Sequence, residues 1–136
     1  MQESTGLLEL LGRTLQVEHA MAGTYFKLVE ACADEETKDL VRKLEHESEA
    51  HVRIVQEAIE GLGGQHQGPQ GVVHSQGATL KVFHDQLEWE RLALWCHKKA
   101  SGLASDPRLK KTLAGIAEAE VNHMAIVEEI ILKLGK

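Results

Sequence analysis

Apolar residues recur at intervals of three and four positions through most of this chain, the spacing that places them on one face of an α-helix. In the second such segment the spacing defines an inward-facing stripe of Val41, Leu44, Val52, Val55 and Ile59. The pattern predicts four long helices, at about residues 5–33, 35–62, 79–104 and 107–134. We therefore expect an all-α protein.

The residues between the predicted helices indicate how these are connected. Asp34, Thr79 and Asp106 are suited to cap helix N-termini, and Pro107 suits a first helical position. The first and third connections are so short that each must join antiparallel helices. The segment 63–78 is rich in Gly and Gln, and its roughly 16 residues reach about 53 Å. Because a helix of about 28 residues is roughly 42 Å long, this crossover can run the length of a bundle and leave the second and third helices parallel.

An internal repeat relates the two predicted hairpins. A shift of 72 residues aligns residues 7–64 with 79–136 without gaps and gives 13 identical pairs out of 58. Glu18, for example, falls on Glu90. The repeat favours a four-helix bundle built from two related antiparallel hairpins and a long crossover, within a single domain that comprises residues 1–136.

Composition and charge exclude several classes of protein. The 15 Lys and Arg against 21 Asp and Glu give a formal net charge of -6, which argues against nucleic acid as a partner because such binding depends on clustered basic residues. No stretch approaches the roughly 18 apolar residues of a membrane span, and the first residues lack the basic start of a secretion signal. We therefore expect a cytoplasmic protein that binds neither nucleic acid nor membrane. Cys32 and Cys96 have no metal-binding spacing and are expected to be ordinary buried or idle thiols.

The third predicted helix carries a second apolar strip, on the side away from its inward stripe. Val82, Trp89 and Cys96 form this strip. An exposed apolar strip of this kind is typical of a partner surface, and we expect the protein to form a homodimer through it.

Five polar residues interrupt the inward apolar stripes at one height in the predicted bundle. Glu18 lies 16 residues before Asp34 and His51 lies 17 residues after it, and the repeat mates of both have the same offsets from Asp106. Because equal offsets place residues side by side in an antiparallel hairpin, these groups should meet in one layer. The five residues are Glu18, His51, Glu90, Glu120 and His123.

The predicted layer places three carboxylates in a low-dielectric interior, with no Lys or Arg on the same inward stripes. Isolated buried charges are very costly, and a pair of divalent cations would compensate them. The sequence Glu120-Val-Asn-His123 puts a carboxylate and an imidazole on one helix face, which suits chelation. The five residues are therefore the predicted metal ligands, and no separate catalytic residue or organic cofactor site is assigned.

With these residues the sequence resembles the ferritin-like superfamily of di-iron or di-manganese carboxylate proteins, over nearly the whole chain and most closely its rubrerythrin and bacterioferritin branch. The resemblance implies that Glu18 and His51 belong to one metal, Glu90 and His123 to the other, and that Glu120 bridges them. It implies two iron ions, with manganese as the alternative. It also implies dioxygen or peroxide as the small-molecule substrate of a di-iron oxidoreductase or an iron-oxidising protein.

The resemblance extends to a tyrosine near the predicted ligands. Tyr25 lies seven residues after Glu18, where the family commonly has a tyrosine beside the metal ligands. In the 72-residue repeat its mate is His97, so the two hairpins differ at this position.

One position departs from the family pattern. Ser48 stands three residues before His51, where the second bridging Glu would be, and three carboxylates leave two divalent ions with an excess of about one charge. Glu45, Glu47 and Glu49 lie nearby. On a regular helix they point about 60° or more away from the Ser48 direction, but a one-residue bulge would turn one of them inward as an alternative ligand. We expect a weakened, asymmetric site that holds one metal tightly, fills the gap with water or an external carboxylate, or is degenerate. In the last case the bundle is a metal-binding, binding or structural module without catalysis.

Overall fold

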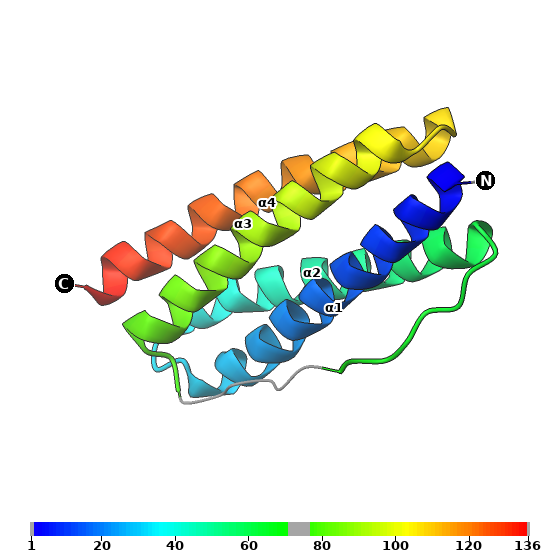
Figure 1. The fold of residues 1–136 in the computed structure, drawn as a ribbon. Helices are drawn as coiled ribbons and strands as arrows, with labels where there is room; N and C mark the ends of the chain where they lie inside the picture. The colour runs from blue at the N-terminus through cyan, green and yellow to red at the C-terminus, as the bar shows by residue number, and fades with distance from the viewer. Residues whose placement is uncertain (1, 71–76, 136) are drawn as a thin grey trace.

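The computed structural model describes residues 2–70 and 77–135, which form four α-helices packed as an elongated bundle (Figure 1). The helices are α1 (Gln2–Ala31), α2 (Glu35–Gly61), α3 (Leu80–Leu103) and α4 (Pro107–Leu134). The described residues contain no β-strand, and the predicted all-α four-helix bundle is confirmed. The first helix begins at Gln2, a few residues earlier than the apolar pattern predicts.

The connections between the helices give the bundle its topology. Helices α1 and α2 form one antiparallel hairpin and α3 and α4 form the other, whereas α2 and α3 run in the same direction (Figure 1). The chain therefore returns along the bundle after α2, as the long crossover requires. The Gln16 side chain ties this return to α1, because it donates to the Gly68 carbonyl at 3.0 Å and accepts from the Gln70 backbone N–H at 2.9 Å. Residues 71–76 of the predicted crossover lie outside the described residues.

Side-chain caps fix where three of the helices begin. The side chains of Asp34, Thr79 and Asp106 each accept a hydrogen bond from the backbone N–H three residues further on. These bonds satisfy N–H groups that have no partner inside the helix, and Pro107 needs none at the start of α4. All three predicted caps are confirmed.

Two apolar clusters fill the interior, one toward each end of the bundle. The first contains Val17, Met21, Tyr25, Leu28, Cys32, Val41, Leu44, Phe83, Leu87, Ala93, Val127 and Ile130. The second contains Leu7, Leu11, Leu15, Ala22, Val52, Val55, Ile59, Ala100, Ala104, Leu113 and Ile116. On every helix the buried Glu and His residues fall near the boundary between these clusters, so a polar layer crosses the middle of the core.

The outer side of α3 differs from the prediction. Cys96 is only 4% exposed and lies near Leu10 and Val17 of α1, so in the strip of Val82, Trp89 and Cys96 only Trp89 is an exposed side chain. Helix α3 packs against α1 as well as α4, and Cys96 is buried on the side that faces α1. The exposed apolar side chains of this helix include Trp89, Leu92 and Trp95, and the homodimer stays a prediction.

The described helices also bear on membrane insertion. None of them combines the length and the apolar character that crossing a bilayer requires.

Candidate metal centre

The polar layer contains all five predicted ligands. Each of the four helices contributes at least one of them. Each ligand lies within the apolar stripe that its helix presents to the core. Four of the five residues are fully buried and the fifth, His51, is 7% exposed. The structure therefore brings together Glu18, His51, Glu90, Glu120 and His123.

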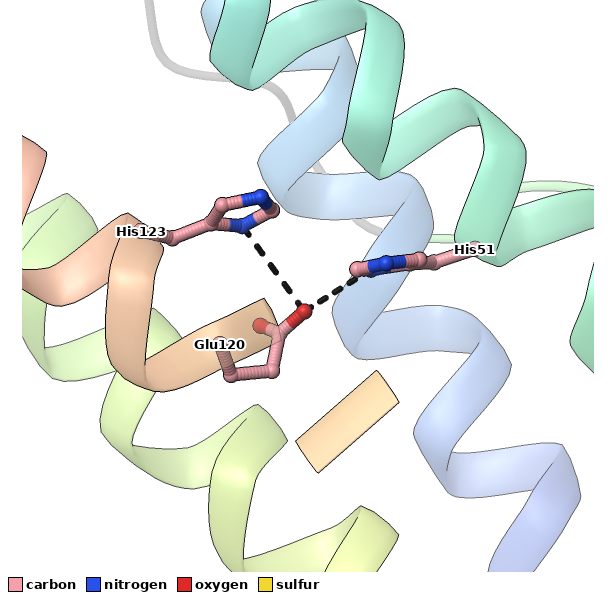
Figure 2. A group of neighbouring side chains, drawn as sticks. All are labelled: His51, Glu120 and His123. Atoms are coloured by element: carbon pink, nitrogen blue, oxygen red, sulfur yellow. Dashed lines mark ion pairs between the residues drawn. The ribbon is translucent and has the colours of Figure 1, made fainter. Parts of the chain in front are cut away.

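Glu120 occupies the centre of the layer. Its Oε1 lies 2.8 Å from Nδ1 of His51 on α2 and 3.8 Å from Nδ1 of His123 on its own helix. Figure 2 shows the carboxylate between the two imidazoles, which reach it from different helices. The two rings are stacked, with centroids 5.5 Å apart. One carboxylate thus faces both hairpins of the bundle.

The two remaining glutamates lie on either side of this centre. Glu18 Oε2 is 3.6 Å from His51 Nδ1, and Glu90 Oε2 is 3.4 Å from His123 Nδ1. Each hairpin therefore contributes one Glu and one His that face each other. This is the arrangement that the equal offsets in the sequence predict.

Two further residues contact the glutamates from the opposite hairpin. The Tyr25 hydroxyl donates to Glu90 Oε2 at 2.8 Å, and His97 Nε2 lies 3.2 Å from Glu18 Oε1. Both side chains are fully buried, and they are mates in the 72-residue repeat. The sequence places Tyr25 near the ligands but assigns no role to His97. The repeat register, in which His97 is the mate of Tyr25, is the pattern that indicates a position near Glu18.

Ser48 is fully buried beside these groups, and the nearby carboxylates differ in what they contact. Glu47 reaches His123, with its Oε1 2.7 Å from Nε2, the ring nitrogen remote from Glu120. Glu45 is buried and lies 3.5 Å from His46, whereas Glu49 is exposed. Of the three alternatives, Glu47 is the one that contacts a predicted ligand, and it does so on the outer side of the ring.

Many polar atoms of the layer lack partners. Within residues 2–70 and 77–135, the ion-pair contacts of the three predicted glutamate ligands are all with histidines. The approach of Glu120 to His51 is close in distance but does not have hydrogen-bond geometry. The same part of the chain offers no hydrogen-bond partner to Glu18 Oε2, Ser48 Oγ, His51 Nδ1, Glu90 Oε1, His97 Nδ1, both Glu120 oxygens and His123 Nδ1. Buried groups of this kind are normally satisfied, so the layer is suited to bind a ligand that is itself positively charged.

The pKa values within the layer are shifted in different directions. Burial, followed by the neighbouring carboxylates of Glu18 and Glu90, raises the pKa of Glu120 far above its ordinary range. Burial also acts to raise the pKa of Glu18, but the adjacent imidazoles of His51 and His97 outweigh it and lower the pKa. Without a metal, the surroundings of the central carboxylate thus favour its protonated form.

The donor atoms are close enough together to chelate. One ligand atom from each of His51, Glu120 and His123 lies within 4.8 Å of the other two. The same holds for a second group, formed by Glu18, His97 and Glu120. The two groups share Glu120. Mixed carboxylate and imidazole donors suit iron, manganese and zinc, and the residues present therefore fit a dinuclear metal centre.

The fold defines this chain as a ferritin-like four-helix bundle, and comparison with solved structures supports that class. A ferritin-like diiron-carboxylate protein from Bacillus anthracis strain Ames superposes with a TM-score of 0.86 and 17% identity, over 96% of this chain and 99% of that one. The Desulfovibrio desulfuricans bacterioferritin superposes with a TM-score of 0.80 and 17% identity, over 95% of this chain and 80% of that one. The predicted ferritin-like fold is confirmed.

Comparison at the level of sequence gives no match. No protein-family model matches the chain, and no curated protein resembles it significantly. At 17% identity the two solved structures establish the fold alone, so the function must be argued from the residues of the site.

Proposed function

We propose that this protein binds two iron ions in its polar layer and uses them in oxidation linked to dioxygen or peroxide, or in the oxidation of iron(II) itself. The observation that carries the proposal is the convergence of unpartnered buried carboxylate and imidazole atoms in two groups that share Glu120. The two solved structures compared above are both described as containing diiron sites, which is consistent with iron as the metal.

The ligand roles follow from which atoms face each other. Glu18 and His51 would hold one ion, Glu90 and His123 the other, and Glu120 both. In each histidine the nitrogen that faces the carboxylates is Nδ1. Bound iron(II) would supply the electrons for reduction of dioxygen or peroxide.

Residues around the ligands would orient them. The Tyr25 hydroxyl donates to Glu90 and limits the directions in which that carboxylate can turn. Glu47 lies against Nε2 of His123, which favours the tautomer with its proton on Nε2 and leaves the Nδ1 lone pair free for a metal. The apolar clusters on both sides of the layer limit the access of water.

Anaerobic titration of metal-free protein with iron(II) tests this proposal. We expect binding of about two ions per chain and thermal stabilisation, because a ligand at 100 times its Kd stabilises the folded state by about 2.7 kcal/mol, or roughly 10 °C for a domain of this size. E120Q should lose most of this binding. The control E128Q removes an exposed carboxylate from the same helix and should bind as the wild type does.

The outcome separates the proposed function from its alternative. If the wild-type protein binds iron(II) and then consumes dioxygen or peroxide, the oxidative role is supported. Binding without consumption would leave a metal-binding module. If neither iron(II) nor manganese(II) binds or stabilises the protein, the bundle has no metal function and the proposal is wrong.

A further inference from the structure

His97 has the surroundings of a metal ligand. It is fully buried on α3, its Nε2 lies 3.2 Å from Glu18 Oε1, and it shares a potential chelating group with Glu18 and Glu120. Its ring centroid is 6.2 Å from that of His51. Across the described ranges its Nδ1 has no hydrogen-bond partner. A buried imidazole next to two carboxylates is a donor that the five predicted ligands do not include.

The internal repeat provides a comparison within the same molecule. Tyr25 is the mate of His97, and its hydroxyl donates to Glu90 as His97 contacts Glu18. Either side chain can hold a carboxylate in place. A neutral imidazole, however, also offers a nitrogen lone pair to a transition metal. Imidazole is the commonest protein ligand for such ions. The repeat therefore has an orienting residue on the Glu90 side and a potential ligand on the Glu18 side.

Ser48 shows why an additional donor matters. In the repeat it is the mate of Glu120, the carboxylate that faces both halves of the centre. The hairpin of α1 and α2 thus has a short hydroxyl where the other hairpin has a carboxylate. Ser48 is fully buried, and its Oγ has no partner among the residues that the structure describes. One donor is therefore missing from the expected set.

We propose that His97 is a metal ligand and that it compensates for the donor missing at Ser48. This inference rests on the proposed metal-binding function and assigns an unequal ligand set to the two halves. The Glu18 half has four donors, from Glu18, His51, His97 and the shared Glu120. The Glu90 half has three, from Glu90, His123 and Glu120. The first equivalent of metal then binds in the Glu18 half, with two imidazoles.

The competing interpretation is that His97 only hydrogen-bonds to Glu18, and the variant H97Q separates the two roles. The Gln side chain retains an N–H donor that can reach Glu18 but has no imidazole nitrogen. If His97 is a ligand, H97Q should weaken binding of the first metal by more than the roughly 10–100-fold that the loss of an outer partner costs. The matched control is H84Q, which makes the same change at an exposed position of α3.

The experiment combines calorimetric titration of metal-free protein with manganese(II) and pulsed EPR of the first equivalent bound. For the wild-type protein we expect two unequal binding steps, and nitrogen couplings from two imidazoles at the first ion. H97Q should lose the tighter step and one of the two couplings, while H84Q keeps both. Circular dichroism establishes that each variant is folded.

Each other result overturns a defined part of the argument. If H97Q binds the first ion as the wild type does, His97 is not a ligand, and the proposed metal function stands. If H97Q does not fold, the wild-type EPR still tests the proposal, because coupling to a single imidazole at the first ion excludes His97. If the wild-type protein binds neither manganese(II) nor iron(II), the proposed function fails and the inference fails with it.

Discussion

The central carboxylate makes the metal-free protein less stable as the pH rises. The pKa of Glu120 is raised by burial and by the adjacent carboxylates of Glu18 and Glu90. The folded protein therefore holds a proton that the unfolded chain releases above the ordinary Glu pKa of 4.5. The stability associated with this proton is fully present below that value and is lost progressively as the pH rises toward the folded-state pKa. E120Q removes the titration and retains nearly the same shape.

The size of the effect follows from proton linkage. A difference of one bound proton between the folded and unfolded states changes the free energy of unfolding by about 1.36 kcal/mol per pH unit. Between pH 6 and pH 8 the wild-type protein should therefore lose about 2.7 kcal/mol relative to E120Q. Since total stabilities are about 5–15 kcal/mol, such a change is readily measured.

Urea denaturation of protein treated with EDTA, at pH 6, 7 and 8, provides the measurement. The difference in unfolding free energy between the wild type and E120Q should grow in favour of E120Q as the pH rises. The control E128Q, at an exposed position, should follow the wild type throughout. A difference between the wild type and E120Q that stays constant from pH 6 to pH 8 would show that Glu120 does not retain a proton in the folded protein.

Three other substitutions test the surroundings of the site. Y25F removes the donor to the buried Glu90 carboxylate and should lower the unfolding free energy of the metal-free protein by about 1.5–3 kcal/mol in urea denaturation. S48E should destabilise the metal-free protein but raise the iron content per chain, and an unchanged iron stoichiometry would refute the idea that Ser48 weakens the site. E47Q should weaken metal binding by about 10–100-fold in calorimetry, since it removes the charged partner of His123 Nε2. Equal affinities for E47Q and the wild type would show that this outer contact has no such role.

The sequence was sufficient for the fold because two independent patterns agree. The helical period of the apolar residues locates the four helices, and the 72-residue repeat pairs them into hairpins. The same repeat predicts the height of each polar residue along the bundle. For that reason the contacts of Glu18 with His51 and of Glu90 with His123 could be anticipated without coordinates.

The parts that could not be predicted share a cause. Helix α3 packs against both α1 and α4, so it has two buried sides, and a single-stripe pattern cannot tell which of its other residues are covered. Cys96 and His97 are both buried on this helix. The apolar pattern predicts Cys96 to lie on an exposed strip and assigns no role to His97. The contact of Glu47 with His123 could not be predicted for another reason. It joins side chains of two different helices, and helical periodicity does not describe contacts between helices.

The position of these polar residues is itself an argument for function. Buried carboxylates without Lys or Arg partners among the described residues conflict with the local rules that favour an apolar core, yet the apolar clusters on both sides are otherwise regular. A conflict of this kind that is confined to one layer is expected where the interior contains a ligand-binding site, here one for a metal ion. The proton on Glu120 and a divalent metal would then compete for the same carboxylate, because ligands must be deprotonated to bind. We therefore expect a bound metal to stabilise the folded protein most at high pH, where the metal-free layer is least favourable.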